Sequence, residues 1–164
     1  MQINNQRKIM VDIGCGNQQQ KCPGCIRIDI NSDYKPDYLH DCNDGLPMFE
    51  NNSVDFVNTD NGLEHFVNPY YVLQECYRVL KSGGEMRVVI PNVQYLPILI
   101  VSPFVDILSF WNWYMRLPWK KERGVHYWLF TKHLILLIVK NVGFEVVECK
   151  GRLYSKEIKL RLMK

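Results

Sequence analysis

The chain has 164 residues, of which 47% are hydrophobic and 23% are charged. This length favours one domain with its own core, and the composition excludes a disordered or fibrous chain. The formal net charge of +3 is too small to indicate a nucleic-acid partner. Residues 1–8 are polar and carry no secretory signal, so we expect a cytoplasmic protein.

A turn containing two glycines follows the first predicted strand. Residues 8–13 and 25–30 are predicted strands, and the sequence Asp-Ile-Gly-Cys-Gly at 12–16 ends the first. The two glycines allow the backbone to approach a ligand closely, and Asp29 in the second strand could bind both hydroxyls of a ribose. Gln19 replaces the third glycine of a dinucleotide fingerprint, which favours a nucleoside without a pyrophosphate, such as S-adenosylmethionine.

The connection between these two strands is short. About eleven extended residues reach about 36 Å, roughly twice the length of a five-residue strand, so a loop is sufficient. We therefore expect the first crossover helix to be shortened or missing, which leaves one sheet face without its usual cover. Cys22-Pro23-Gly24-Cys25 within this loop favours a plain turn, with a local disulfide or redox pair and a metal site as alternatives. No second cysteine pair has zinc-site spacing, so no metal site is predicted.

The remaining sequence alternates strand-like and helix-like segments, which predicts a parallel sheet with helices on its faces. One helix should start at Asn68-Pro69 and end at Ser82-Gly83-Gly84, and another should run from Thr131 to Asn141. The last strand alternates apolar and basic residues, which suits a solvated sheet edge; a polyanion-binding strip is the alternative. The further predicted strands are residues 37–40, 54–59, 84–91, 144–150 and 156–163.

Residues 96–119 are the most apolar part of the chain. Pro97, Pro103 and Asp106 interrupt this segment, which disfavours a membrane-spanning helix. We treat residues 96–124 as an apolar lid or interface insertion within a single domain of residues 1–164. The segment could close over the substrate, pack on the uncovered sheet face or form a homodimer interface. Peripheral membrane contact is the less favoured alternative.

Four motifs occur in the order and near the spacing of a known family. They are VDIGCG from residue 11, the stretch Asp29–Pro47, VDFVNTDNGLEHF from residue 54 and RVLKSGGEMRVVIPN from residue 78. On these motifs, the chain resembles the small class I S-adenosylmethionine-dependent methyltransferases of the type 11 methyltransferase-domain family. The resemblance implies a doubly wound, Rossmann-like α/β sheet of seven strands in the order 3-2-1-4-5-7-6, with the last strand antiparallel. It also implies S-adenosyl-L-methionine as the cofactor.

The resemblance assigns the cofactor site residue by residue. The methionine end would be bound by Asp12, Gly14, Cys15 and Gly16, the ribose by Asp29, the adenine by Asp41 and Cys42, and the pocket would be lined by Thr59, Asp60 and Asn61. For Asp12 and Asp29, the alternative is a carboxylate that caps its own loop, and Asp44 is a rival of Asp41.

The candidate catalytic residues are His65, in the family's L-E-H motif, and His126, which precedes an aromatic run. Methyl transfer from a sulfonium needs no general acid, and a base is required only where the acceptor must lose a proton. Either histidine could be this base, or it could have a structural role.

The sequence does not identify the methyl acceptor. We rank small molecules or glycan precursors first, protein side chains second and nucleic acids third. Residues 58–61 lack the Asn/Asp-Pro-Pro-Tyr motif of amino-directed DNA methylation, which disfavours base methylation. A non-catalytic binding or assembly module and a nucleotide-dependent oxidoreductase are the rival functions.

Overall fold

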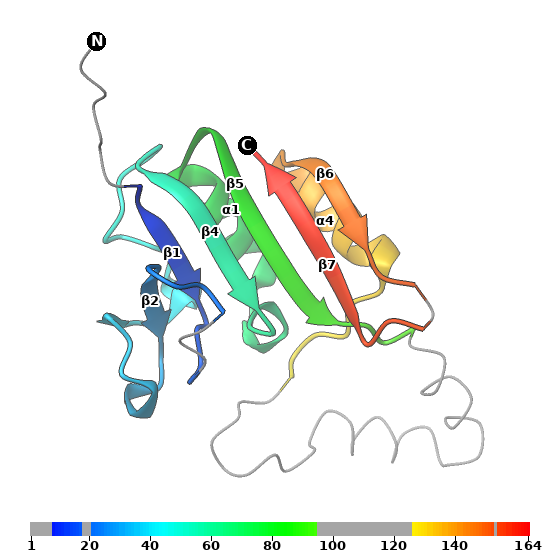
Figure 1. Ribbon diagram of the computed structural model, residues 1–164, viewed down its shortest axis with the longest axis horizontal. Helices are drawn as coiled ribbons and strands as arrows, with labels where there is room; N and C mark the ends of the chain where they lie inside the picture. The colour runs from blue at the N-terminus through cyan, green and yellow to red at the C-terminus, as the bar shows by residue number, and fades with distance from the viewer. Residues whose placement is uncertain (1–7, 18–20, 95–125, 153) are drawn as a thin grey trace.

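The computed structural model describes residues 8–17, 21–94, 126–152 and 154–164. They form a seven-stranded sheet in the order β3-β2-β1-β4-β5-β7-β6 (Figure 1). The strands are β1 (Met10–Ile13), β2 (Ile26–Asp29), β3 (Tyr38–Leu39), β4 (Val54–Asp60), β5 (Leu80–Pro91), β6 (Glu145–Lys150) and β7 (Glu157–Met163). β7 is antiparallel to both of its neighbours, whereas the other paired strands are parallel. The predicted strand order and the reversed last strand are confirmed.

Two helices, α1 (Pro69–Val79) and α4 (Lys132–Val142), pack on the same face of the sheet, behind it in Figure 1. The side chain of Asn68 accepts a hydrogen bond from the Tyr71 N–H, and Thr131 caps α4 in the same way. Gly143 ends α4 with a left-handed φ of 115°, which glycine adopts without a steric cost. These caps confirm the predicted starts of both helices.

The predicted end of the first helix is wrong. α1 ends at Val79, and Leu80 already pairs with Val54 in the sheet. Ser82-Gly83-Gly84 therefore lies within β5, where the Gly83 N–H donates to the Lys164 carbonyl. A Cβ at Gly84 would lie 2.9 Å from the Lys81 carbonyl oxygen, so the glycine permits a tight bend in the strand.

The two faces of the sheet differ in chemistry. On the helix-covered face, Val88 of β5 and Leu160 of β7 are paired and buried. One residue away in register, a polar row runs across the opposite face: Asp12, Asn58, Arg87 and Arg161 are aligned on four neighbouring strands. Side chains alternate between faces along a strand, so this face is polar along the row. Arg87 and Arg161 are exposed, whereas Asp12 and Asn58 are buried.

The described parts of the first crossover, residues 14–17 and 21–25, contain no helix, as expected from its length. Both described α-helices lie on one face of the sheet, so no described α-helix covers the opposite face (Figure 1). The predictions for residues 96–119 and 96–124 lie outside the described residues. None of the described helices is long and apolar enough to cross a membrane.

Three short 3₁₀ helices follow strands at their carboxyl ends. They are η1 (Ser32–Tyr34) after β2, η2 (Cys42–Asp44) after β3 and η3 (Leu63–His65) after β4. The carboxyl ends of parallel strands meet at one edge, which is where α/β sheets bind ligands. The candidate site is therefore built by the loops at this edge.

Candidate functional site

The loop after β1 depends on glycine at two positions. Gly14 and Gly16 have φ values of 60° and 55°, in the left-handed region that other residues seldom adopt. A Cβ at Gly14 would lie 3.3 Å from the Cα of Gly62 and 3.4 Å from the Phe66 ring. The loop after β1 and the turn after β4 therefore pack directly against each other.

Asp29 and Arg27, which share one face of β2, hold the Gly16 peptide groups from two sides. The Gly16 N–H donates to Asp29 Oδ2 at 2.8 Å, and the Gly16 carbonyl accepts from the Arg27 guanidinium at 2.7 Å. Asp29 Oδ1 accepts from the Asn31 N–H at 2.9 Å. Asp29 thus caps its own loop, yet each of its oxygens retains a lone pair for a ligand hydroxyl. Sequence reasoning missed Arg27, although its place two residues before Asp29 puts both on one face.

Asp12 is buried at the end of β1, with 3% of its surface exposed. Asn58 on the neighbouring strand donates to Asp12 Oδ1 at 2.6 Å. Burial raises the pKa of Asp12 to about 6, against the lowering effect of the Asn58 hydrogen bond. The Asp12 carboxyl group is therefore fixed beside the glycine loop, and its ionised form destabilises the folded protein.

The end of β4 places three predicted residues together. Asp60 forms ion pairs with Lys21 from the first crossover and, at 3.1 Å, with Arg87 from β5. Asn61 has a left-handed φ of 53° and donates to Asp60 at 2.8 Å. The Thr59 hydroxyl is buried and has no hydrogen-bond partner within the described part of the chain. Asp60 therefore positions its neighbours, whereas Thr59 retains an unused polar group.

Asp41 and Cys42 lie where the resemblance places the adenine. Asp41 caps η2, with its Oδ1 accepting from the backbone and the side chain of Asn43 at 2.9 and 2.8 Å. Burial raises the pKa of Cys42 to about 12 and that of Cys15 to about 11, so both side chains are neutral thiols at pH 7. The two cysteines can therefore contribute backbone and packing rather than a nucleophile. Asp44, the rival of Asp41, is exposed.

The two predicted catalytic histidines, His65 and His126, are in contact in the folded chain. The His65 and His126 rings are 4.5 Å apart between centroids, in an edge-to-face arrangement. The segment that leads into α4 is held beside η3 because the N–H groups of Tyr127 and Trp128 donate to the Glu64 carbonyl. Burial, followed by the effect of His65, lowers the pKa of His126 to about 4, so His126 is a neutral imidazole at pH 7.

Glu64, whose carboxyl group lies near both histidines, was assigned no role from the sequence. Only 1% of its surface is exposed, and burial raises the pKa of its carboxyl group to about 7. Within the described residues, neither carboxylate oxygen has a hydrogen-bond partner. The L-E-H motif was the signal for Glu64, but burial and lack of partners are visible only in the fold.

Cys22 and Cys25 form a disulfide bond, which corrects the prediction of a plain turn. The turn itself is present, because the Cys25 N–H donates to the Cys22 carbonyl at 3.1 Å. The tight turn brings the two residues within bonding distance, with Cα atoms 5.5 Å apart.

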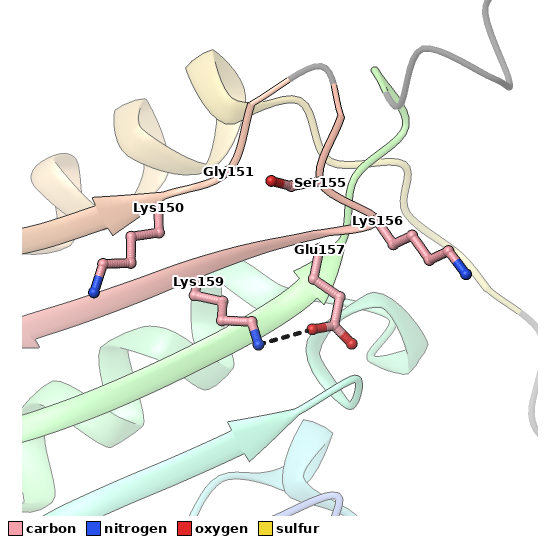
Figure 2. Close-up of a pocket in the computed structure, with 6 residues that line it drawn as sticks. All are labelled: Lys150, Gly151, Ser155, Lys156, Glu157 and Lys159. Carbon is pink, nitrogen blue, oxygen red and sulfur yellow. Dashed lines mark ion pairs between the residues drawn. The ribbon is translucent and has the colours of Figure 1, made fainter.

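A lysine-lined pocket of about 430 Å³ lies at the corner between β6 and β7 (Figure 2). It is lined by Lys150, Gly151, Ser155, Lys156, Glu157 and Lys159, none of which is a predicted site residue. Lys159 pairs with Glu157 at 3.1 Å, and Lys150 pairs with Glu148 at 2.8 Å. Both ion pairs are exposed to solvent, so the glycine loop remains the stronger candidate site. The prediction that the last strand is a sheet edge is wrong, because β7 lies between β5 and β6 and β6 forms that edge.

Comparison with known proteins agrees with this geometry. Residues 11–88 match the family model for the type 11 methyltransferase domain. The chain is similar to an S-adenosylmethionine-dependent methyltransferase of Thermotoga maritima, described as a possible histamine N-methyltransferase. This pair has 19% identity and a TM-score of 0.68, and the match covers 97% of this chain and 83% of the other.

Two further solved structures share the fold. Methyltransferases of the same cofactor class from Archaeoglobus fulgidus and Methanosarcina mazei both give a TM-score of 0.65, at 16% and 18% identity. The first match covers 96% of this chain and 86% of the Archaeoglobus protein. The second covers 97% of this chain and 93% of the Methanosarcina protein. No curated protein matches the chain significantly. The resemblance inferred from the four sequence motifs is confirmed.

Proposed function

We propose that this chain, which has the fold of S-adenosylmethionine-dependent methyltransferases and a methyltransferase domain over residues 11–88, transfers a methyl group from S-adenosylmethionine to a small molecule or glycan precursor. The observation that carries the proposal is the Gly16 loop. Arg27 and Asp29 hold both peptide groups of Gly16. Gly14 and Gly16 have a left-handed backbone that glycine adopts because it has no Cβ, and the missing side chains leave the backbone open to a ligand.

The residues present fit this cofactor. The backbone of residues 14–16 would hold the methionine end, and Asp29 would accept hydrogen bonds from the ribose. The buried Thr59 hydroxyl, which has no hydrogen-bond partner among the described residues, could bond to the ligand. Asp12 would orient the methionine end, and the backbone of Cys42 would meet the adenine. When bound, S-adenosylmethionine supplies an electrophilic methyl group on a sulfonium.

Positioning then accounts for most of the chemistry. The loop would position the methyl group, and the turn after β4, which packs against this loop, would be close to the acceptor. His126, a neutral imidazole beside His65, can take the proton that a hydroxyl or amine acceptor loses. We rank protein side chains second and nucleic acids third as acceptors. A homodimer through residues 96–119 and a cytoplasmic location remain parts of the proposal.

The first test is calorimetry with S-adenosylmethionine and its demethylated product, S-adenosylhomocysteine. We expect saturable binding of both, and weaker binding of NAD. Absence of binding at millimolar cofactor would support the non-catalytic module instead, and tighter binding of NAD would support the oxidoreductase. A transfer assay with tritium-labelled cofactor and lysate fractions then sorts acceptors by class.

A ligand–variant cycle isolates the ribose contact, because Asp29 also holds its own loop. Asp29→Ala should weaken binding of S-adenosylhomocysteine by about 1–3 kcal/mol. The 2′-deoxyribose analogue of S-adenosylhomocysteine should bind the unaltered protein more weakly than S-adenosylhomocysteine does. In Asp29→Ala, loss of the 2′-hydroxyl should change the affinity little. Equal sensitivity to the missing hydroxyl in both proteins would show that Asp29 serves the loop alone. Asp33→Ala, at an exposed carboxylate, is the control.

A further inference from the structure

We propose that Glu64, His65 and His126 bind a divalent transition-metal ion beside the cofactor loop. Each of the three residues offers one ligand atom, and these atoms all lie within 4.8 Å of one another. The sequence predicted no metal site, because no second cysteine pair had zinc-site spacing. The fold alone brings the three donors together.

The buried Glu64 carboxyl group is the second observation that points to a ligand. Its side chain is 2% exposed and faces His65, with 4.0 Å between Glu64 Oε1 and His65 Nε2. Both carboxylate oxygens lack a hydrogen-bond partner in the described structure. A buried carboxylate without hydrogen bonds is costly, and a bound cation would compensate this cost. A structural role for Glu64 alone would leave both oxygens unsatisfied.

The donors are held by a rigid frame. The Glu64 carbonyl accepts from the N–H groups of Tyr127 at 2.9 Å and Trp128 at 3.3 Å, and the Trp128 indole donates to the Val67 carbonyl at 3.2 Å. Phe130, which follows, is 1% exposed and anchors the segment in the core. These contacts join the two chain segments that supply the donors, independently of the two imidazole rings.

A metal ion would require only a small closure of the cluster. Ligand atoms bound to zinc at about 2.0–2.2 Å lie about 3.4 Å apart in a tetrahedral site, so each pair within 4.8 Å must approach by at most about 1.4 Å. Rotation of the Glu64 and His65 side chains can supply this movement without a backbone change.

The donor set indicates which ions fit. Two imidazoles and one carboxylate suit zinc, cobalt(II), nickel(II) or iron(II), whereas magnesium and calcium prefer oxygen ligands. Three protein ligands leave a coordination position open, which is typical of sites that bind a substrate or water.

The cluster lies next to the cofactor loop, because a Cβ at Gly14 would contact Gly62 at 3.3 Å and the Phe66 ring at 3.4 Å, on either side of η3. One consequence rests on the proposed function and replaces His126 as the base, since a nitrogen that binds a metal cannot also take a proton: the open position would bind an acceptor hydroxyl and promote loss of its proton to solvent. The oxygen lone pair would then form the bond to the methyl carbon, and the pair of the broken carbon–sulfur bond would remain on sulfur.

Cobalt(II) titration of the chelator-treated full chain tests metal binding without cofactor or acceptor. We expect one equivalent to bind and to give visible absorption bands of nitrogen and oxygen coordination. Glu64→Gln and His126→Asn should each weaken binding by at least about tenfold, since even outer partners of metal ligands change affinity by about 10- to 100-fold. His133→Asn, at an exposed histidine of α4, should bind cobalt as the unaltered protein does.

A second measurement needs no variant. Substoichiometric cobalt should broaden the ring signals of His65 and His126 in the proton NMR spectrum and leave those of His40 and His133 sharp. Binding that survives Glu64→Gln unchanged, cobalt–thiolate absorption, or broadening of His40 or His133 would overturn the proposal, as would no binding at all. S-adenosylhomocysteine calorimetry on the same samples shows whether the proposed function fails separately.

Discussion

Asp12→Asn should make the protein more stable at neutral pH while weakening its cofactor site. Burial raises the pKa of Asp12 from 3.8 to about 6, and only 3% of the residue is exposed. This difference of about 2 pKa units corresponds to about 3 kcal/mol at most, because each unit is worth about 1.4 kcal/mol. The substitution retains an oxygen that can accept the Asn58 hydrogen bond and removes the buried charge.

The pH dependence has a defined sign. The folded protein holds the Asp12 proton more tightly than the unfolded chain, so this group stabilises the fold below the unfolded pKa of 3.8 and the contribution is lost as pH rises through about 6. Between about pH 4 and about pH 8, the unaltered protein should lose about 2 kcal/mol of unfolding free energy relative to Asp12→Asn. Groups common to both proteins cancel in this difference.

Urea unfolding at both pH values, followed by circular dichroism, measures the effect. Asp55→Asn is the control, because the Lys81 hydrogen bond lowers the pKa of Asp55, so its stabilising effect is present above pH 3.8, is lost only at lower pH, and should add little pH dependence in this range. Equal pH slopes for the unaltered protein and Asp12→Asn would refute the assignment of a buried, destabilising charge. Calorimetry with S-adenosylhomocysteine should show weaker binding by Asp12→Asn.

Three further substitutions probe the frame of the site, each by urea unfolding. Gly62→Ala should cost about 1–3 kcal/mol and weaken cofactor binding, because its Cβ would lie 2.9 Å from Thr59 Oγ1; unchanged stability would show that the turn can relax. Arg78→Lys should cost about 1–2 kcal/mol, since it loses the two-point pairing with Glu75 at 2.8 Å, and an unchanged midpoint would contradict this. Leu160→Ala should cost about 2–5 kcal/mol, because this β7 side chain is 2% exposed; a smaller loss would indicate a loosely packed core.

Local signals in the sequence were sufficient for much of the fold. Asn68 and Thr131 are cap residues whose side chains accept hydrogen bonds from N–H groups only three residues ahead, so the neighbouring sequence is enough to predict them. The alternation of apolar and basic residues in β7 follows from the two-residue period of a strand and a single buried face. The end of α1 was mistaken because Gly83-Gly84 is also a helix-ending signal, and only pairing with β4 showed that it lies in a strand.

The sequence by itself determined the glycine loop and the carboxylate on the next strand, because both belong to one short strand–loop–strand unit. Only the tertiary structure decided that Arg27 and Asp29 hold Gly16 from two sides and that Glu64 and His65 meet His126. Such contacts depend on how segments that are far apart in the sequence pack together, and local residue preferences do not specify that packing. The burial of the Glu64 carboxyl group and the lack of hydrogen-bond partners for its oxygens among the described residues are properties of the folded chain alone.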